Sequence, residues 1–405
     1  MNKKISEESL NFFYFFGFIK ENQTIIEGVK SFEPGYLYEV DFSNNFNKIK
    51  VFDVADIFRS TQKKEIDLKE HFENNLINHL QSDVPVAVLL SSGLDSSVIL
   101  NTLNEKKINT HAITLGFEEF KGKIDDETII SDKFCKYLKI NHKKIYLTNN
   151  EIIDRLDNFF LNMDQPSYDG LNTYLVTQIL KENNFKVAIS GLGADELFGG
   201  YNTFSRMKFL NKIRFLYNNL IFKFLINILN KFFQGNKYFF FFKLLSEFNS
   251  PYQIYLLLRS KKDSLFKVNI NNIKKILNEK NDYDEMEISN MTSLLESKIY
   301  MKNQLLKDTD WASMANSIEI RVPFVDYDFL ESFKYSEFNI KNGKKSIFKR
   351  LFKIPKFIFK KKKTGFNIPY KQIIDLYNKK YKTNYKNWSE ICLKEYFKTL
   401  KINLN

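Results

Sequence analysis

The strongest indication of the fold is the segment Val84-Pro-Val-Ala-Val-Leu-Leu-Ser-Ser-Gly-Leu-Asp-Ser-Ser97. Val84 to Leu90 is a short apolar run of the kind that is buried as a central parallel strand. Small residues follow, and a helical pattern begins at Asp95. Such a turn binds anions, because the helix dipole and backbone N–H groups point toward it. It lacks the Gly-Lys-Ser/Thr of a P-loop, and its hydroxyls and carboxylate favour pyrophosphate with magnesium. An ordinary turn with Asp95 or Ser96 as helix cap is the alternative.

A second strand ends in a loop of similar composition. Phe185 to Ser190 is a short apolar run, and Gly191-Leu-Gly-Ala-Asp195-Glu196-Leu-Phe-Gly-Gly-Tyr201 follows it. In an open parallel sheet, ligands bind beyond the carboxyl ends of the strands, where neighbouring loops converge. We therefore expect Asp95 and Asp195 to face each other across one crevice and to hold Mg²⁺ that bridges ATP phosphates.

These motifs resemble those of a known family. The first loop resembles the pyrophosphate-binding loop of the N-type ATP pyrophosphatases, Ser-Gly-Gly-x-Asp-Ser, and the second resembles the Ser-Gly-x-Gly-x-Asp-Glu-x-Phe-x-Gly-Tyr signature of the asparagine synthetases. The resemblance spans about residues 60–370. Three further segments share it: Asp164-Gln-Pro-Ser-Tyr-Asp-Gly-Leu-Asn-Thr-Tyr174, Leu305 to Asp326, and Lys363-Thr-Gly-Phe366.

The resemblance implies a two-step reaction with ATP and Mg²⁺ as cofactors. A carboxylate, aspartate in the namesake enzymes, attacks the α-phosphate of ATP and releases pyrophosphate, and ammonia then displaces AMP to give an amide. The implied pyrophosphate site is Ser91, Ser92, Gly93, Asp95 and Ser96, with the metal between Asp95 and Asp195. Leu90 and Leu115 would enclose the adenine, and Ser190 and Gly191 would cover the nucleoside. The implied catalytic residues are Lys363, Asp195, Glu196 and Arg321.

Lys363 also has a simpler interpretation. It closes a run of four lysines that begins at Lys360, and such a run is typical of a solvated face. The Gly-Phe that follows Lys363 at the family spacing distinguishes it from its neighbours.

The N-terminus departs from the family pattern. Glutamine-dependent members carry a cysteine just after the initiator methionine, whereas the cysteines of this chain are Cys135 and Cys392, which we expect to be buried thiols. Residues 9–54 resemble the closing stretch of the family's glutaminase domain. We expect a remnant of that domain over 1–58, a synthetase domain over 60–370, and a helical, lysine-rich tail over 371–405. Glutamine hydrolysis within the chain is not expected, so ammonia, free or from a separate glutaminase subunit, is the predicted nitrogen source.

Leu192 is the second departure. Aspartate-specific members commonly have glutamate there, which positions or deprotonates ammonia, and leucine does neither. Either Glu196, Asp164 or Asp169 takes that role, or the acceptor is not aspartate. We expect aspartate as the acceptor, and a uronic acid of a surface polysaccharide is the second candidate. Two other readings stay open: a ligase with a different nucleophile, as in the β-lactam synthetases, and a non-catalytic subunit of a split glutamine amidotransferase.

Composition and periodicity bound the remaining expectations. The net charge of +13 reflects a surplus of lysine, and without a recognisable nucleic-acid motif it favours anionic small-molecule substrates. Two cysteines without metal spacing and no apolar leader predict a reducing, cytoplasmic setting. A homodimer stays open. Strands near 84–90, 110–115, 143–147 and 186–190 alternate with helices, which predicts an α/β fold with a doubly wound parallel sheet like that of the adenine-nucleotide α-hydrolases. Strand character over 35–42, a polar turn over 43–47 and a boundary over 59–65 precede it, and a helical pattern follows beyond 200.

The segment from Lys208 to Leu245 is rich in Phe, Leu and Ile punctuated by lysines. It is interrupted too often for a transmembrane helix. We expect a helical hairpin that packs its apolar stripe on the α/β core, so that membrane contact is not expected. A basic amphipathic helix lying on a membrane is the alternative.

Overall fold

A computed structural model describes residues 4–43, 46–59, 64–232, 237–261, 268–279, 282–336, 340–360 and 367–402. Its contacts divide the chain into two compact units. Unit 1 comprises Met1–Thr61 and Gly199–Asn303, and unit 2 comprises Gln62–Phe198 and Gln304–Asn405. This division follows packing alone. The three-part organisation expected from the family resemblance stays a prediction.

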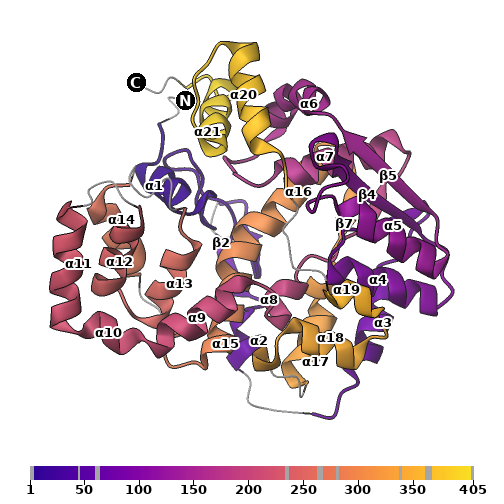
Figure 1. The fold of residues 1–405 in the computed structure, drawn as a ribbon, viewed down its shortest axis with the longest axis horizontal. Helices are drawn as coiled ribbons and strands as arrows, with labels where there is room; N and C mark the ends of the chain where they lie inside the picture. Colours follow the sequence, from indigo (N-terminus) through magenta and orange to yellow (C-terminus); the bar gives the residue numbers. More distant parts are fainter. Residues whose placement is uncertain are drawn as a thin grey trace. The chain divides into compact units, whose positions relative to one another are not determined.

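Unit 2 is built on a five-stranded parallel sheet, which confirms the predicted α/β class (Figure 1). The strands are β3 (Val86–Leu89), β4 (His111–Phe117), β5 (His142–Leu147), β6 (Val187–Ile189) and β7 (Glu319–Arg321). Their order is β5-β4-β3-β6-β7. From β3 the chain proceeds to β4 and β5 on one side, and from β6 to β7 on the other. The carboxyl ends of β3 and β6 therefore form the topological switch point, where open α/β sheets bind ligands.

The fifth strand corrects the expectation of a purely helical pattern beyond residue 200. Glu319 to Arg321 are not helical but pair in parallel with β6, Val187 opposite Glu319 and Ile189 opposite Arg321. Three residues are too few to show the alternation that identifies a strand. The strand forms because the edge of β6 supplies its hydrogen bonds.

Both faces of the sheet are covered, as a doubly wound fold requires. Ala87, Ile113 and Ala188 form one buried face with Leu180 of α7 (Leu171–Glu182). Alternate residues point to the other face, and there Val88, Ala112 and Ile189 are buried. Helices α4 (Leu94–Glu105) and α5 (Glu127–Leu138) pack against β3 and β4.

The other elements of unit 2 surround this sheet (Figure 1). They are α3 (Leu68–Asn78), α6 (Asn149–Asn162), α8 (Ala194–Phe198), α16 (Lys307–Met314), α17 (Tyr327–Tyr335), α18 (Lys344–Leu351), α19 (Lys356–Lys360), α20 (Tyr370–Tyr381), α21 (Trp388–Thr399) and the short turns Glu118–Phe120, Pro323–Val325 and Ile340–Asn342. A π-helical segment, Glu296–Leu306, precedes α16 and carries the chain from unit 1 into unit 2.

Unit 1 is a helical unit with one small hairpin. Its helices are α1 (Glu7–Phe16), α2 (Ala55–Arg59), α9 (Asn202–Lys212), α10 (Arg214–Asn218), α11 (Leu220–Phe232), α12 (Lys237–Glu247), α13 (Pro251–Arg259), α14 (Ile270–Leu277) and α15 (Ile288–Leu295). Strand β1 (Tyr36–Val40) lies within the expected strand. The polar turn expected over 43–47 is wrong at Phe46 and Asn47, which begin β2 (Phe46–Lys50) and pair with β1.

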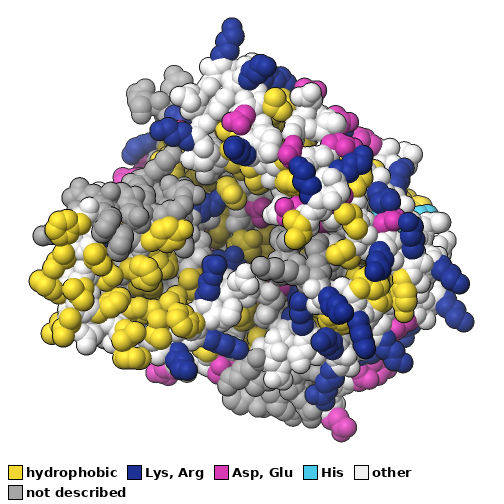
Figure 2. All heavy atoms as spheres, viewed as in Figure 1, with side chains coloured by type: hydrophobic (Ala, Val, Ile, Leu, Met, Phe, Trp, Pro, Cys, Tyr) yellow, Lys and Arg dark blue, Asp and Glu magenta, His cyan; other side chains and the backbone are white. Residues whose placement is uncertain are grey.

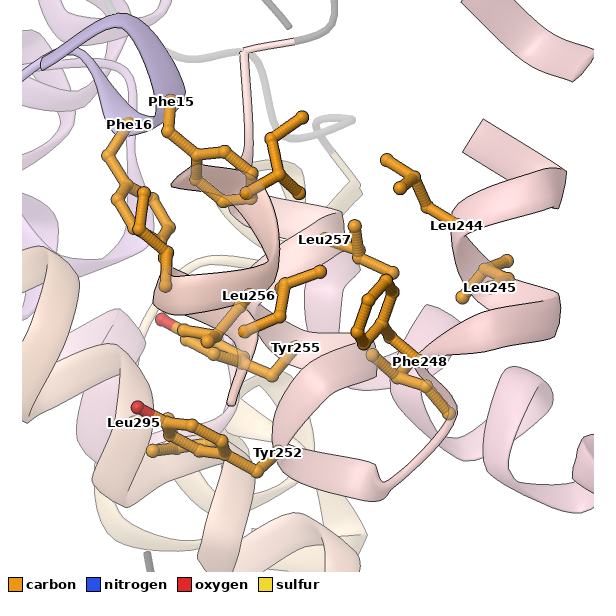
Figure 3. Close-up of a cluster of buried hydrophobic side chains, with 14 of the residues drawn as sticks. Phe15, Phe16, Leu244, Leu245, Phe248, Tyr252, Tyr255, Leu256, Leu257 and Leu295 are labelled. Carbon is orange, nitrogen blue, oxygen red and sulfur yellow. The ribbon is translucent and has the colours of Figure 1, made fainter. Parts of the chain in front are cut away.

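A core of aromatic and aliphatic side chains holds unit 1 together. In Figure 3, Phe15 and Phe16 of α1 lie beside Tyr255 and Leu256 of α13, and Leu244 of α12 approaches from the opposite side. These residues come from both sequence segments of unit 1. Residues 4–59 are therefore anchored by packing against 199–303.

The helices α10 and α11 differ from the expectation for the 208–245 segment. Their apolar stripe was expected to be buried, yet Phe215, Leu220 and Phe224 are exposed, whereas Ile226 points into unit 1. Helix α11 is apolar around most of its circumference, so packing one face leaves apolar residues on the other. Among the described helices, none has the length and apolar character needed to cross a bilayer.

Candidate functional site

The loop after β3 is held by its own hydroxyl groups. The Ser91 N–H donates to the Ser96 hydroxyl oxygen at 3.1 Å, and the Gly93 N–H donates to the Ser91 hydroxyl oxygen at 3.0 Å. Within the described part of the chain, the first turn of the twelve-residue helix α4 has no side-chain cap at Gly93, and anion binding by its N–H groups stays a prediction.

The loop after β6 packs directly against the first loop. A Cβ atom added to Gly191 would lie 2.8 Å from the Cβ atom of Asp95 and 2.9 Å from the backbone nitrogen of Ser96. Only glycine permits this approach. Ser190 is fixed from the other side, because its N–H donates to the Arg321 carbonyl oxygen at 2.9 Å. The close contact brings the two acidic residues, Asp95 and Asp195, to one place.

A lysine joins these two carboxylates. The Lys344 Nζ atom lies 2.8 Å from a carboxylate oxygen of Asp95 and also forms an ion pair and a hydrogen bond with Asp195. Lys344 is buried, and burial alone disfavours its charge, but the two carboxylates outweigh burial and raise the pKa of Lys344 above its ordinary value. The group is thus a cation held between two anions.

Beside this triad lies a cavity of about 280 Å³. Its lining includes most of the residues proposed to bind ATP. The lining residues are Leu89, Leu90, Ser91, Asp95, Ser96, Ile113, Leu115, Glu127, Asn172, Thr173, Val176, Ser190, Gly191, Leu192 and Asp195. Strands β3 and β4 contribute apolar residues to the lining, and the loops after β3 and β6 contribute hydroxyl, glycine and carboxylate residues. The lining therefore combines an apolar wall, suited to a base, with an anion-binding edge.

Four other predicted residues are not among those that line the cavity: Ser92, Gly93, Glu196 and Arg321. Ser92 is buried, and its hydroxyl donates to Glu127 at 3.3 Å. Glu196 is buried and is not part of the cavity lining. Arg321 Nη1 donates to the carbonyl oxygens of His79 and Gln81, each at 2.7 Å. These contacts favour a structural role for Arg321, and its catalytic role stays a prediction.

Lys363, the predicted catalytic lysine, lies outside the described residues, as do its neighbours from 361 to 366. Its role stays a prediction. The carboxylates considered as substitutes for a glutamate at position 192, Asp164 and Asp169, are not among the residues that line the cavity. Leu192 does line it, so the residue that departs from the family pattern faces the ligand space.

Sequence reasoning missed Lys344, although a signal was present. Lys344, Ile347, Phe348 and Leu351 recur at helical spacing, so they share one face of α18. Ile347 and Phe348 are buried, and Phe348 packs edge-on against Phe198 of α8, with ring centroids 4.9 Å apart. The apolar neighbours at i+3 and i+4 place Lys344 on the buried face, whereas Lys345 is exposed.

The residues present fit a magnesium ion. Mg²⁺ is usually held by one or two carboxylates together with phosphate oxygens and water, and Asp95 and Asp195 supply two carboxylates aimed at a common point. The described residues contain no group of three or more His, Cys, Asp or Glu side chains that could hold a metal ion. A metal at this place would therefore complete its coordination with phosphate oxygens or water.

The segment from Leu305 to Asp326, which shares the family resemblance, places a buried carboxyl group, Asp308, in α16. Asp308 accepts hydrogen bonds from the Trp311 indole N–H at 3.0 Å and the Ser167 hydroxyl at 2.5 Å. Burial, helped by the charge of Asp169, raises the pKa of Asp308 to about 7 against the lowering effect of the two hydrogen bonds. Its charge state therefore changes near neutral pH.

Three known proteins resemble this chain over shares of its length that range from 46% to 90%. The asparagine synthase family model matches residues 67–390. Asparagine synthetase (glutamine-hydrolyzing) 1 of Bacillus subtilis is 27% identical over 390 residues, which are 90% of this chain and 60% of that protein. Putative asparagine synthetase (glutamine-hydrolyzing) 2 of Methanocaldococcus jannaschii is 28% identical over 53% of this chain and 43% of that protein. Asparagine synthetase (glutamine-hydrolyzing) of Zea mays is 31% identical over 46% of this chain and 33% of that protein. The matches thus cover 60% or less of the length of these relatives.

Proposed function

Because the chain belongs to the asparagine synthase family, we propose that it is an ATP-dependent amide ligase. It adenylates a carboxylate, releases pyrophosphate, and amidates the activated acid with ammonia. The observation that carries the proposal is the meeting of Asp95, Asp195 and Lys344 beside a cavity at the switch point of the sheet. Binding and cleavage of a nucleoside triphosphate require such an arrangement of cation, carboxylates and backbone N–H groups.

In the first step, a carboxylate oxygen of the acceptor forms a bond to the α-phosphorus of ATP, and the bond to the leaving pyrophosphate breaks. Negative charge on the leaving group increases, so fixed donors lower the barrier. The N–H groups at the start of α4 and the Lys344 ammonium would hold the pyrophosphate, and Lys363 would neutralise the α-phosphate. Mg²⁺ held by Asp95 and Asp195 would supply further positive charge at the phosphates.

In the second step, ammonia attacks the acyl carbon, the bond to AMP breaks, and the attacking nitrogen loses a proton. Leu192 offers no base for that proton. Of the predicted carboxylates, Asp195 lines the cavity and Glu196, its neighbour, is buried. We propose ammonia, free or delivered by a separate glutaminase subunit, as the nitrogen donor.

Aspartate is the first candidate for the acceptor, and the carboxylate of a uronic acid is the second. The position of Leu192 in the cavity lining favours keeping the second candidate, because an apolar side chain there removes the carboxylate that aspartate-specific relatives are expected to use.

Pyrophosphate release from ATP and Mg²⁺ tests the proposal. Aspartate and a nucleotide-linked uronic acid are compared as acceptors, each with ammonium chloride, with glutamine and without a nitrogen donor. We expect pyrophosphate and the amide with ammonium and one acceptor. Asp195→Asn should abolish release, whereas Asp164→Asn, outside the cavity lining, should retain it. A chain that binds ATP but releases no pyrophosphate with any acid would be a non-catalytic subunit instead.

A further inference from the structure

An apolar surface on unit 1 has no role in the proposed chemistry. It is formed by Phe215 of α10 and by Leu220, Ile221, Phe224, Leu225 and Phe232 of α11, all of them exposed. Leu220 and Phe232 retain 82% and 80% of their full exposure. Hydrophobic side chains gather over this region in Figure 2, at its left edge. Single exposed apolar residues are common, but a contiguous patch of this kind marks an interaction surface. We call it the α10–α11 surface.

The helix that carries most of this surface is apolar on two sides. Ile226 points into unit 1, where Tyr217 and Phe222 pack with the core, and this packing is enough to anchor α11. Leu220, Ile221, Phe224 and Leu225 are not needed for it. They follow the i, i+4 spacing of a single outward face, so this face contacts something other than the core of unit 1.

The charge around the surface identifies the contact. From Leu197 to Ser246 the chain has eight Lys and Arg residues and no Asp or Glu. The whole chain has 48 acidic residues in 405, so fifty residues would carry about six on average. Arg206, Lys208 and Lys212 on α9 are exposed, and Arg214 and Lys223 are half-buried beside the apolar residues. The partner is therefore apolar and anionic over an extended area.

We propose that the α10–α11 surface binds the face of an anionic lipid bilayer, with α11 lying in the plane of the interface. Phenylalanine and leucine side chains enter the boundary between headgroups and acyl chains, while lysine and arginine reach the lipid phosphates. A protein partner would be expected to meet some acidic residues in this region, since protein interfaces balance both signs of charge. The inference is independent of the proposed ligase activity.

Flotation with vesicles of phosphatidylcholine alone, and of phosphatidylcholine mixed with phosphatidylglycerol, tests the proposal on the full chain. We expect at least about tenfold stronger binding to the anionic vesicles, weakened by salt. The combined change Leu220→Ser, Ile221→Ser and Phe224→Ser should reduce it at least about thirtyfold. The matched control changes Phe42, Ile124 and Leu161 to serine, which are exposed apolar residues elsewhere, and should alter binding less than about twofold.

A charge variant separates the two contributions. Each lysine near an anionic bilayer strengthens binding about fivefold, so Lys212→Gln with Lys223→Gln should weaken binding about 25-fold at low salt. Equal flotation of the unaltered chain and the serine variant overturns the proposal. The proposal is also overturned if the unaltered chain does not bind anionic vesicles and forms dimers, whereas the serine variant is monomeric. The surface would then be a protein interface.

Discussion

Replacing Lys344 by methionine tests the charge arrangement at the centre of the site. Methionine keeps most of the length of the side chain but removes the ammonium that joins Asp95 and Asp195. The three side chains are only 8%, 18% and 14% exposed. Lys344→Met therefore leaves two facing, largely buried carboxylates without their shared cation, and breaking a buried ion pair in this way costs about 3 to 5 kcal/mol of unfolding free energy.

Tryptophan fluorescence during urea unfolding measures this loss in unit 2, because the two tryptophans of the chain, Trp311 and Trp388, are both buried there. With an m-value of about 3 kcal/mol per molar urea, the midpoint should fall by about 1 M. Millimolar MgCl₂ should raise the midpoint of Lys344→Met more than that of the unaltered chain, since the released carboxylates bind a divalent cation. Lys349→Met, on the exposed face of the same helix, is the control.

Lys344→Met should also slow pyrophosphate release by about 10²- to 10³-fold, because a fixed cation at a developing charge is lost. The reasoning is refuted if Lys344→Met and Lys349→Met have the same urea midpoint, with and without Mg²⁺. A normal rate of pyrophosphate release in Lys344→Met would refute the catalytic part alone.

Three further predictions concern pH, backbone contact and the thiols. Asp308→Asn should flatten the pH dependence of stability. The pKa of Asp308 is about 7 in the folded chain and near 4 in the unfolded chain, so between these values the folded chain binds the extra proton and its free energy of unfolding falls by up to about 4 kcal/mol as pH rises. Melting temperatures that change equally with pH in both proteins, from acidic to neutral pH, would contradict this. Gly191→Ala should weaken ATP binding at least about tenfold in a calorimetric titration, because its Cβ atom would meet Asp95, and an unchanged Kd would disprove the contact. Cys135 and Cys392, both buried, should react with a thiol reagent only in urea, since burial raises the pKa of Cys135 to about 12; rapid labelling of the folded chain would show that they are accessible.

The sheet was predictable because its central strands are read from local pattern alone. Val86 to Leu89 and Val187 to Ile189 are continuous apolar runs that end in small residues, and buried parallel strands require this composition. The same logic placed Asp95 and Asp195 at the ends of neighbouring strands. By contrast, β7 exists only through its pairing with β6, and pairing between residues 187 and 319 leaves no local trace in the sequence.

Lys344 and the exposed face of α11 were not predicted, because lysine and phenylalanine are common throughout the chain. Lys344 is followed by Lys345 and lies near the run from Lys360, so it resembled one more solvated charge; its apolar partners at i+3 and i+4 carry the distinguishing information. The opposite error occurred at α11. Its leucines and phenylalanines were assigned to a core, yet composition alone does not show which apolar residues the tertiary packing leaves outside.

Transfer of oxygen-18 from the carboxylate of the acceptor to AMP would show whether the reaction passes through an acyl-adenylate. The reaction is run with ATP, Mg²⁺, ammonium chloride and the labelled acid that supports turnover, and the AMP is analysed by mass spectrometry. Formation of an acyl-adenylate makes the carboxylate oxygen the bridge to the α-phosphorus, so we expect oxygen-18 in the AMP released with each amide. Label in inorganic phosphate, with ADP as the nucleotide product, or unlabelled AMP would contradict it.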